Sequence, residues 1–240
     1  SADAYAEMSF GIDKTSVEAG SRALKAKYST EIAQDLQAIH GLSAETELAN
    51  ILSSEILNEM NREIIQRVGA QAKIGALTGT TTAGLFDVAD SVDNRGARWG
   101  GERYKALAIQ INREANLIGK ETGRGAGNFL IVSPDVASAL DMTGNMREPG
   151  MEVSSGMNTD VAGGGVFAGT YGNKYKVFID QYAPVDYVTV GYKGASEMDA
   201  GYFYCPYVPM QMAKSQGEED FQPRIGFKQR YGVVNNPFVT

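Results

Sequence analysis

Reactive and metal-binding side chains are scarce in this sequence. Its 240 residues include one cysteine, one histidine and one tryptophan. The single Cys205 cannot form a disulfide within the chain, so a reducing compartment is the expected environment. One cysteine and one histidine also cannot supply the nitrogen and sulfur ligands of an ordinary zinc site. These absences exclude a disulfide-stapled scaffold and a zinc centre built within one chain.

Positive charge and long apolar runs are also in short supply. The chain has 22 Lys and Arg against 29 Asp and Glu, a net charge of −7. A dedicated nucleic-acid binder needs a basic face and a peripheral membrane protein a polybasic patch, so neither class is expected. No apolar run reaches the roughly 18 residues of a membrane-spanning helix. The 43% hydrophobic content predicts a folded protein of one large or two modest domains.

Helix signals dominate the first part of the chain, after an extended stretch at 8–28. Ser29 or Thr30 can cap a short helix that ends at Gly41. A second helix is predicted from Ala44 to Val68, with Gly69 as its end. At 1.5 Å per residue it would be about 37 Å long. So long an amphipathic helix needs a sheet or a neighbouring subunit to lie against.

The later part of the chain favours strands. A third amphipathic helix is predicted at about 101–118, and a buried strand at 129–132. Ser133-Pro-Asp135 has the order of a helix start. The glycine-rich segment 144–173 reads as a flexible loop. Further strands are predicted near 175–180, 186–192, 201–208 and 225–234. Helices followed by strands indicate an α+β fold.

Three features could carry chemistry, and each has a plainer interpretation. His40 lies in the last turn of a predicted helix, where the helix dipole favours positive charge. Asp87, Asp90 and Asp93 recur every third residue, which is not the spacing of a calcium loop, so an exposed acidic loop is favoured over a weak cation site. The glycine-rich segment 123–128 precedes a strand, whereas a dinucleotide-binding loop follows one, so a tight packing turn is favoured. A soluble hydrolase using His40 or the three aspartates stays open as an alternative.

Two groups of residues are candidates for contacts between subunits. Arg98 and Arg103 flank Trp99, a combination used for stacking on single-stranded nucleic acid and also enriched in protein–protein hot spots. The net negative charge favours the second use. The basic residues near the start of the chain could be simply solvated or could form salt bridges between subunits; they are Arg22, Lys25 and Lys27.

Two aromatic, strand-forming stretches, 199–209 and 221–231, favour self-association over catalysis. With the second stretch extended to 221–238, and together with three further groups of residues, they resemble the major capsid protein of T-even-type tailed bacteriophages. The further groups are 44–50 on the long helix, 124–129 with 133–140, and 188–194. The resemblance covers nearly the whole chain. It implies the tailed-phage (Hong Kong 97-type) major capsid fold, with a long spine helix, peripheral β-structure and an axial domain.

Mapped onto this fold, the resemblance implies four regions. Residues 1–28 correspond to the returning arm of an extended loop, and 29–69 to the helical part of the peripheral domain with the spine helix. Residues 70–184 correspond to the axial domain, and 185–240 to the peripheral β-structure. The family's amino-terminal arm and carboxy-terminal segment have no counterpart here, so we expect this sequence to be a portion of a longer mature chain.

The implied function is structural. Copies would form a homo-hexamer, join neighbouring capsomers and close an icosahedral-type shell around double-stranded DNA held by non-specific enclosure, with no enzyme activity, cofactor, metal or membrane contact. Vertex, portal, scaffold and decoration proteins are the implied partners. The protein would be made in the host bacterial cytoplasm and reside in the virion. An encapsulin-like cargo compartment and a self-associating adhesion or tube protein remain alternatives.

Overall fold

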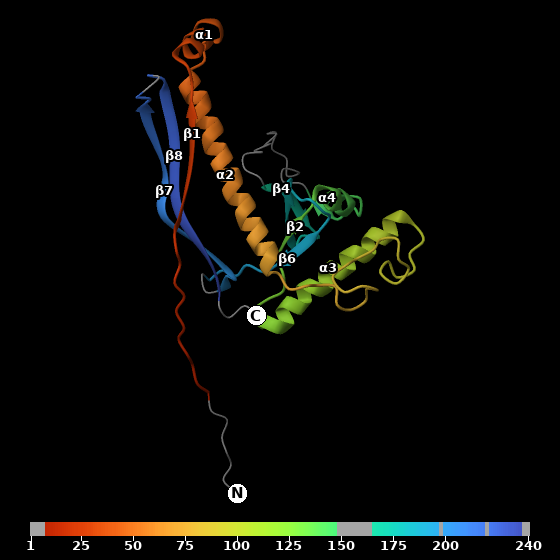
Figure 1. Cartoon of the computed structure of the whole chain (residues 1–240). Helices are drawn as coiled ribbons and strands as arrows, with labels where there is room; N and C mark the ends of the chain where they lie inside the picture. Colours follow the sequence, from red (N-terminus) through yellow and green to blue (C-terminus); the bar gives the residue numbers. More distant parts are fainter. Residues whose placement is uncertain (1–7, 148–164, 197–198, 219–220, 237–240) are drawn as a thin grey trace.

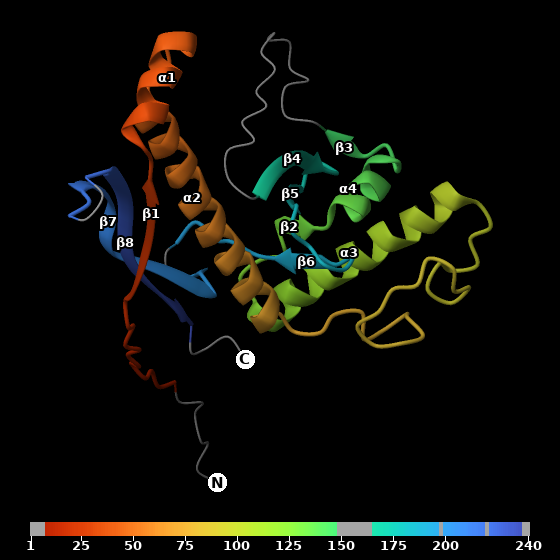
Figure 2. The same cartoon turned by 45° about the horizontal axis from the view of Figure 1, so that its top comes forward.

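The computed structural model describes residues 8–147, 165–196, 199–218 and 221–236. Within these residues the chain forms two units (Figure 1). One is a three-stranded sheet with a long helix lying along it, and the other is a five-stranded sheet flanked by two helices. Figure 2 separates the two units, with the long helix between the sheets. The predicted α+β class is confirmed.

The three-stranded sheet brings together segments from both ends of the chain. In order across the sheet, its antiparallel strands are β1 (Gly20–Lys27), β8 (Pro223–Asn235) and β7 (Tyr202–Gln216). β7 and β8 form a long ribbon whose register shifts between Pro206 and Val208 and between Val208 and Gln211. The strands expected near 201–208 and 225–234 are therefore confirmed, and β7 is longer than expected.

The long helix α2 (Ala44–Gln71) packs on this sheet. Its 28 residues span about 42 Å at the standard rise. Leu52 and Ile56 of α2 form a buried cluster with Ile225 and Phe227 of β8. Burying such a side chain contributes about 1.5–3 kcal/mol. The sheet is thus the long partner that the helix requires.

Local hydrogen bonds explain where the first helix begins and ends. In α1 (Thr30–His40) the Ser29 hydroxyl accepts a hydrogen bond from the Ile32 amide at 3.2 Å. Gly41 ends the helix with φ 65°, a left-handed conformation that glycine adopts without steric cost. The predicted Ser29 cap and Gly41 end are both confirmed.

The five-stranded sheet has mixed directions. Its strands, in order, are β3 (Met146–Arg147), β4 (Gly165–Tyr171), β5 (Tyr175–Asp180), β2 (Phe129–Val132) and β6 (Val188–Gly191). β2 pairs with β5 in parallel and with β6 in antiparallel register. The helix α4 (Pro134–Asp141) follows β2 directly and supplies the crossover toward β5. The predicted buried strand and the helix start after Ser133 are confirmed.

Two helices bury one face of this sheet. α3 (Gly100–Thr122) and α4 pack over β2 and β5, and the cluster includes Leu130, Val132 and Leu140, each 0% exposed. Small residues on α3, Ala108 and Ala115, let the helix approach the strands closely. This core positions the loops of the second unit.

The glycine-rich segment 123–128 is a packing turn, as predicted. A Cβ on Gly125 would lie 2.7 Å from the Tyr192 ring. A Cβ on Gly127 would lie 2.9 Å from Val190. Only a residue without a side chain allows this approach to β6 and the residue that follows it.

Two sequence-based boundaries were wrong. α2 continues through Gly69 to Gln71, because glycine lowers helix stability by only about 1 kcal/mol and need not end a helix. The ends of the predicted loop 144–173 form β3 and β4, paired with each other, while 148–164 lies outside the described residues. β6 belongs to the five-stranded sheet because it pairs with β2. The expected division of the chain at 184/185 stays a prediction.

Candidate assembly surfaces

A clamp of polar side chains joins α2 to both neighbouring strands of the three-stranded sheet. The Tyr231 hydroxyl donates a hydrogen bond to Glu63 at 2.6 Å. Arg22 and Arg67 each donate to the same carboxylate at 2.9 Å. Burial favours the neutral acid, but these donors outweigh it and lower the pKa of Glu63 below its ordinary value. Burial, aided by the bond to Glu63, raises the pKa of Tyr231 to about 12.

The basic residues of the first strand are divided by its pleat. Alternate side chains of a strand point to opposite faces. Arg22 therefore lies on the face toward α2, where it pairs with Glu59 at 3.5 Å as well as with Glu63. Lys25 and Lys27 are exposed on the other face. The acids of the long helix do pair with Arg22, but within one chain, and the three cations do not form a single cluster.

The arm that precedes β1 follows β8 before leaving the body of the protein. Arg230 donates from Nε to the Ala19 carbonyl at 3.2 Å. A Cβ on Gly232 would lie 2.7 Å from the Glu18 carbonyl oxygen, so glycine is needed where the arm crosses β8. The extended conformation expected for 8–28 is confirmed, with only its last part in a sheet.

Beyond that contact the arm projects into solvent (Figure 1). Three large apolar side chains at alternate positions are almost fully exposed: Met8 at 99%, Phe10 at 91% and Ile12 at 88%. Side chains two apart on an extended segment share one side. Contiguous exposed apolar surface of this kind marks an interaction site.

The loop between α2 and α3 is held together by its three aspartates. The buried Asp93, 2% exposed, accepts hydrogen bonds from the amides of Thr81 at 2.7 Å and Asp87 at 2.8 Å. Asp90 accepts from the Thr81 hydroxyl at 2.6 Å, which lowers the pKa of Asp90. The expectation of an exposed acidic loop is wrong for Asp93. These carboxylates bind backbone and hydroxyl donors, which is a structural role.

Trp99 lies at the end of this loop, immediately before α3. Its side chain is 75% exposed. Arg98 is exposed beside it, and Arg103 donates from Nε to the Ala97 carbonyl at 3.3 Å. The three predicted residues therefore share the start of α3, and Arg103 also fastens the loop. Their predicted contact with another subunit stays a prediction.

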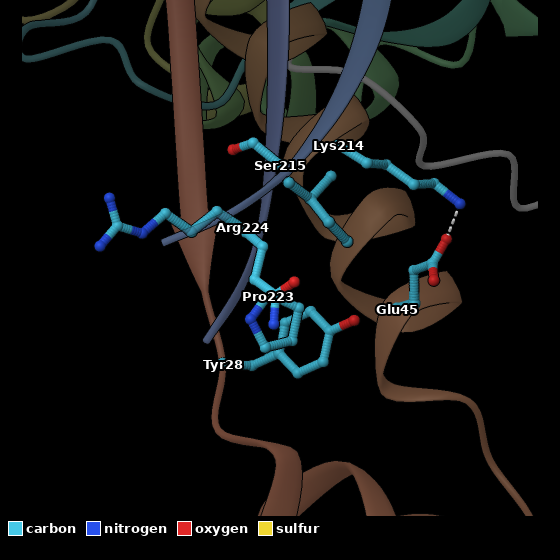
Figure 3. A pocket seen from close by; sticks show the side chains of 8 residues that line it. Tyr28, Glu45, Lys214, Ser215, Pro223 and Arg224 are labelled. Atoms are coloured by element: carbon cyan, nitrogen blue, oxygen red, sulfur yellow. Dashed lines mark hydrogen bonds and ion pairs between the residues drawn. The ribbon is translucent and has the colours of Figure 1, made fainter. Parts of the chain in front are cut away.

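The far end of the β7–β8 ribbon meets the start of α2 around a cavity of about 290 Å³ (Figure 3). Lys214 of β7 forms an ion pair with Glu45 in the first turn of α2. Tyr28, Pro223 and Arg224 line the same cavity from the ends of β1 and β8. Both charges of the pair are partly exposed, at 55% and 40%. The pair links the ribbon end to the helix, and its exposure keeps its contribution to stability small.

The single histidine lies at the surface of the described structure. His40 is exposed in the last turn of α1, where sequence analysis placed it. Among the described residues there is no group of three or more histidine, cysteine or acidic side chains that could hold a metal ion. None of the helices in the described part of the chain is both long and apolar enough to cross a membrane.

Sequence analysis missed the clamp at Glu63. The signal was present, because Glu63 continues the stripe of α2 that contains Leu52 and Ile56. A carboxylate on an apolar stripe needs a buried partner. That partner, Tyr231, comes from the other end of the chain and could not be read from local spacing.

The fold is that of tailed-phage capsid proteins. It matches "The capsid of Myoviridae Phage XM1" with a TM-score of 0.50 at 9% identity, covering 93% of this chain and 71% of that one. At such low identity the likeness concerns the fold alone. It agrees with the Hong Kong 97-type fold expected from the sequence.

The family follows from sequence similarity. The family model described as "Major capsid protein Gp23" matches residues 1–240. The major capsid protein of Vibrio phage KVP40 is 57% identical over 97% of this chain and 46% of its own length. That of Enterobacteria phage T6 is 49% identical over 97% of this chain and 47% of its own length. This chain therefore belongs to the Gp23 major capsid protein family, and it spans about half the length of these curated relatives. The hydrolase and encapsulin alternatives find no support in these relatives.

Proposed function

We propose that this protein is the structural unit of a phage head. Copies associate into hexamers, hexamers join into a closed shell, and the shell encloses double-stranded DNA in the virion. Membership of the Gp23 family supports this role. No bond-making chemistry is part of it.

In this proposal the two units have different places in the shell. The three-stranded sheet with α1 and α2 is the peripheral domain, and its exposed Lys25 and Lys27 contact the neighbouring capsomer. The five-stranded sheet with α3 and α4 is the axial domain near the centre of the hexamer, where Trp99 with Arg98 and Arg103 meets the next subunit. The axial domain extends to the end of β6. The net charge of −7 lets packaged DNA lie against the wall without tight binding.

The exposed apolar arm is the observation that carries the proposal. Leaving Met8, Phe10 and Ile12 in water forgoes about 1.5–3 kcal/mol for each side chain. Covering them on a neighbouring copy recovers this free energy only on assembly. Many such modest contacts, closed into a shell, give a stable particle through multivalency.

Electron microscopy of particles formed by the full-length protein tests the shell. Closed particles of uniform size are expected. Filaments would favour a tube or adhesion protein, and a protein that stays monomeric would contradict the proposal. Nucleic acid in particles isolated from infected cells separates a phage head from a cargo compartment.

A variant of the arm tests whether its exposed apolar side chains are needed for assembly. Replacing Met8, Phe10 and Ile12 together by serine leaves the fold intact, because all three side chains are exposed, and is expected to reduce shell yield at least tenfold. The matched control is Thr15→Ala, an exposed polar position on the same arm. Shells that form normally without the three apolar side chains would contradict this part of the proposal.

A further inference from the structure

A pocket of about 320 Å³ lies in the second unit, between α3 and the turn that joins β4 to β5. Lys105 and Asn112 reach it from α3, Lys174 from the turn, Tyr175 from the start of β5, and Asn145 from the segment before β3. Within the part of the chain that the structure describes, no aspartate or glutamate lines it. The pocket therefore combines two cations and two side-chain amides with no negative charge.

The floor of the pocket is rigid. The Tyr175 ring is 2% exposed, and its hydroxyl donates to Asn112 Oδ1 at 2.7 Å. Asn112 Nδ2 donates in turn to the Ala108 carbonyl at 3.0 Å. On the other side the Tyr171 hydroxyl lies 3.1 Å from the Thr143 hydroxyl. A fixed floor lowers the entropy lost when a group is bound.

One of the two cations is held at the pocket wall. Lys174 Nζ lies 4.9 Å from the centroid of the Tyr175 ring, a cation–π contact that keeps the ammonium beside the cavity. Lys105 lies on the facing side, on α3. No carboxylate pairs with either lysine among the residues that the structure describes. The pocket is prepared for an anionic group that the chain itself does not provide.

We propose that this pocket receives the carboxylate of an aspartate or glutamate from a second copy of the protein in the shell. This inference rests on the proposed function, because it requires a neighbouring copy. Ammonium groups and amide N–H donors both favour a carboxylate, and charge-assisted hydrogen bonds are the stronger ones. The cavity volume is at the lower end of ordinary ligand sites, which suits one side chain.

The charge of the chain favours this occupant over nucleic acid. Each copy carries 29 Asp and Glu, so a shell surrounds every pocket with carboxylates. Binding a nucleic-acid strand needs a basic face or a groove that follows successive phosphates. Two lysines in one concave site offer no such track. The contact would fix the orientation of neighbouring subunits more than it adds affinity.

Charge reversal tests the pocket. The double variant Lys105→Glu and Lys174→Glu is expected to lower the yield of closed shells from the full-length protein at least tenfold. Charge removal, Lys105→Gln with Lys174→Gln, is expected to have a smaller effect. The matched control is Lys176→Glu, which is exposed on β5 next to the buried Tyr175 and does not line the pocket. Normal assembly of the reversed variant would overturn the proposal.

Cross-linking of wild-type shells gives a second readout that does not depend on whether a variant folds. Shells assembled from equal amounts of ¹⁵N-labelled and unlabelled protein are treated with a carbodiimide, which joins an amine to a carboxylate in direct contact. Peptides that link Lys105 or Lys174 to an acid of the other isotope are expected, and they identify that acid. Links confined to one isotope, or no links at either lysine, would overturn the proposal.

The failure of this inference can be told from failure of the proposed function. If wild-type protein forms no shells, the proposed function is wrong. If wild-type and reversed variants both form shells, only the pocket proposal is wrong. If the variant forms empty shells normally but fails to hold DNA, the ligand is a nucleic-acid phosphate and the proposal is also overturned.

Discussion

Replacing Glu63 by glutamine is expected to lower the free energy of unfolding by about 1–3 kcal/mol. Glutamine keeps the shape of the side chain and one acceptor, so the change removes mainly the charge. Tyr231 is only 5% exposed, so its hydrogen bond to the charged Glu63 is shielded from water. This bond is expected to contribute most of the effect. The contacts from Arg22 and Arg67 contribute less, because these side chains are 45% and 51% exposed.

The same variant predicts a change in pH dependence. The pKa of Glu63 is lowered in the folded state, so its contribution to stability is complete above the ordinary value of 4.5 and is lost as the pH falls through the lowered value. The difference between wild type and Glu63→Gln is therefore largest near pH 7 and shrinks below pH 4.5. Urea unfolding of the full-length protein, followed by circular dichroism across this range, measures the difference.

Glu59 provides the matched control for this prediction. It lies one turn away on the same helix and contacts the same Arg22, but at 3.5 Å and with 56% of its side chain exposed. Glu59→Gln is expected to change stability by less than about 0.5 kcal/mol. Equal effects at the two positions, or a difference at Glu63 that stays constant from pH 7 to acid, would refute the reasoning.

Three further changes test other parts of the structure. Asp93→Asn should raise amide hydrogen exchange throughout 78–94. The variant loses a charged acceptor of two backbone amides, which lowers the stability of the loop by about 1–3 kcal/mol. Unchanged exchange would contradict the structural role of Asp93. Gly232→Ala should detach the arm at Glu18, since the new Cβ meets a carbonyl oxygen at 2.7 Å, and limited proteolysis of the arm reports it. Tyr231→Phe should reduce the loss of stability that wild type shows as the pH rises from 10 through about 12, because the raised pKa of Tyr231 stabilises the fold only while its phenol stays protonated.

Several local features were predictable because neighbouring residues determine them. The Ser29 cap and the Gly41 end of α1 depend on side chains within one helical turn. The buried strand at Phe129–Val132 follows from a short apolar run before a helix-starting Ser-Pro-Asp. The end of α2 was misjudged, since Gly69 permits a helix end without requiring one.

The candidate surfaces were only partly predictable. Trp99 with its arginines was found from composition, and its exposure agrees with a contact surface. The basic residues of β1 were grouped by sequence distance, but the pleat sends Arg22 to one face and Lys25 to the other. The pocket between Lys105 and Lys174 joins segments 69 positions apart, so local residue spacing could not predict it.

The sequence alone determined the family, the α+β class and the helix boundaries set by caps, because long segment similarity and short-range hydrogen bonding are both written in consecutive residues. Only the tertiary structure decided that Tyr231 meets Glu63, that Asp93 is buried and that two distant lysines face one cavity. These depend on how segments distant in the sequence pack together and on which face each side chain takes. That pairing is fixed by packing across the whole molecule, which local patterns do not contain.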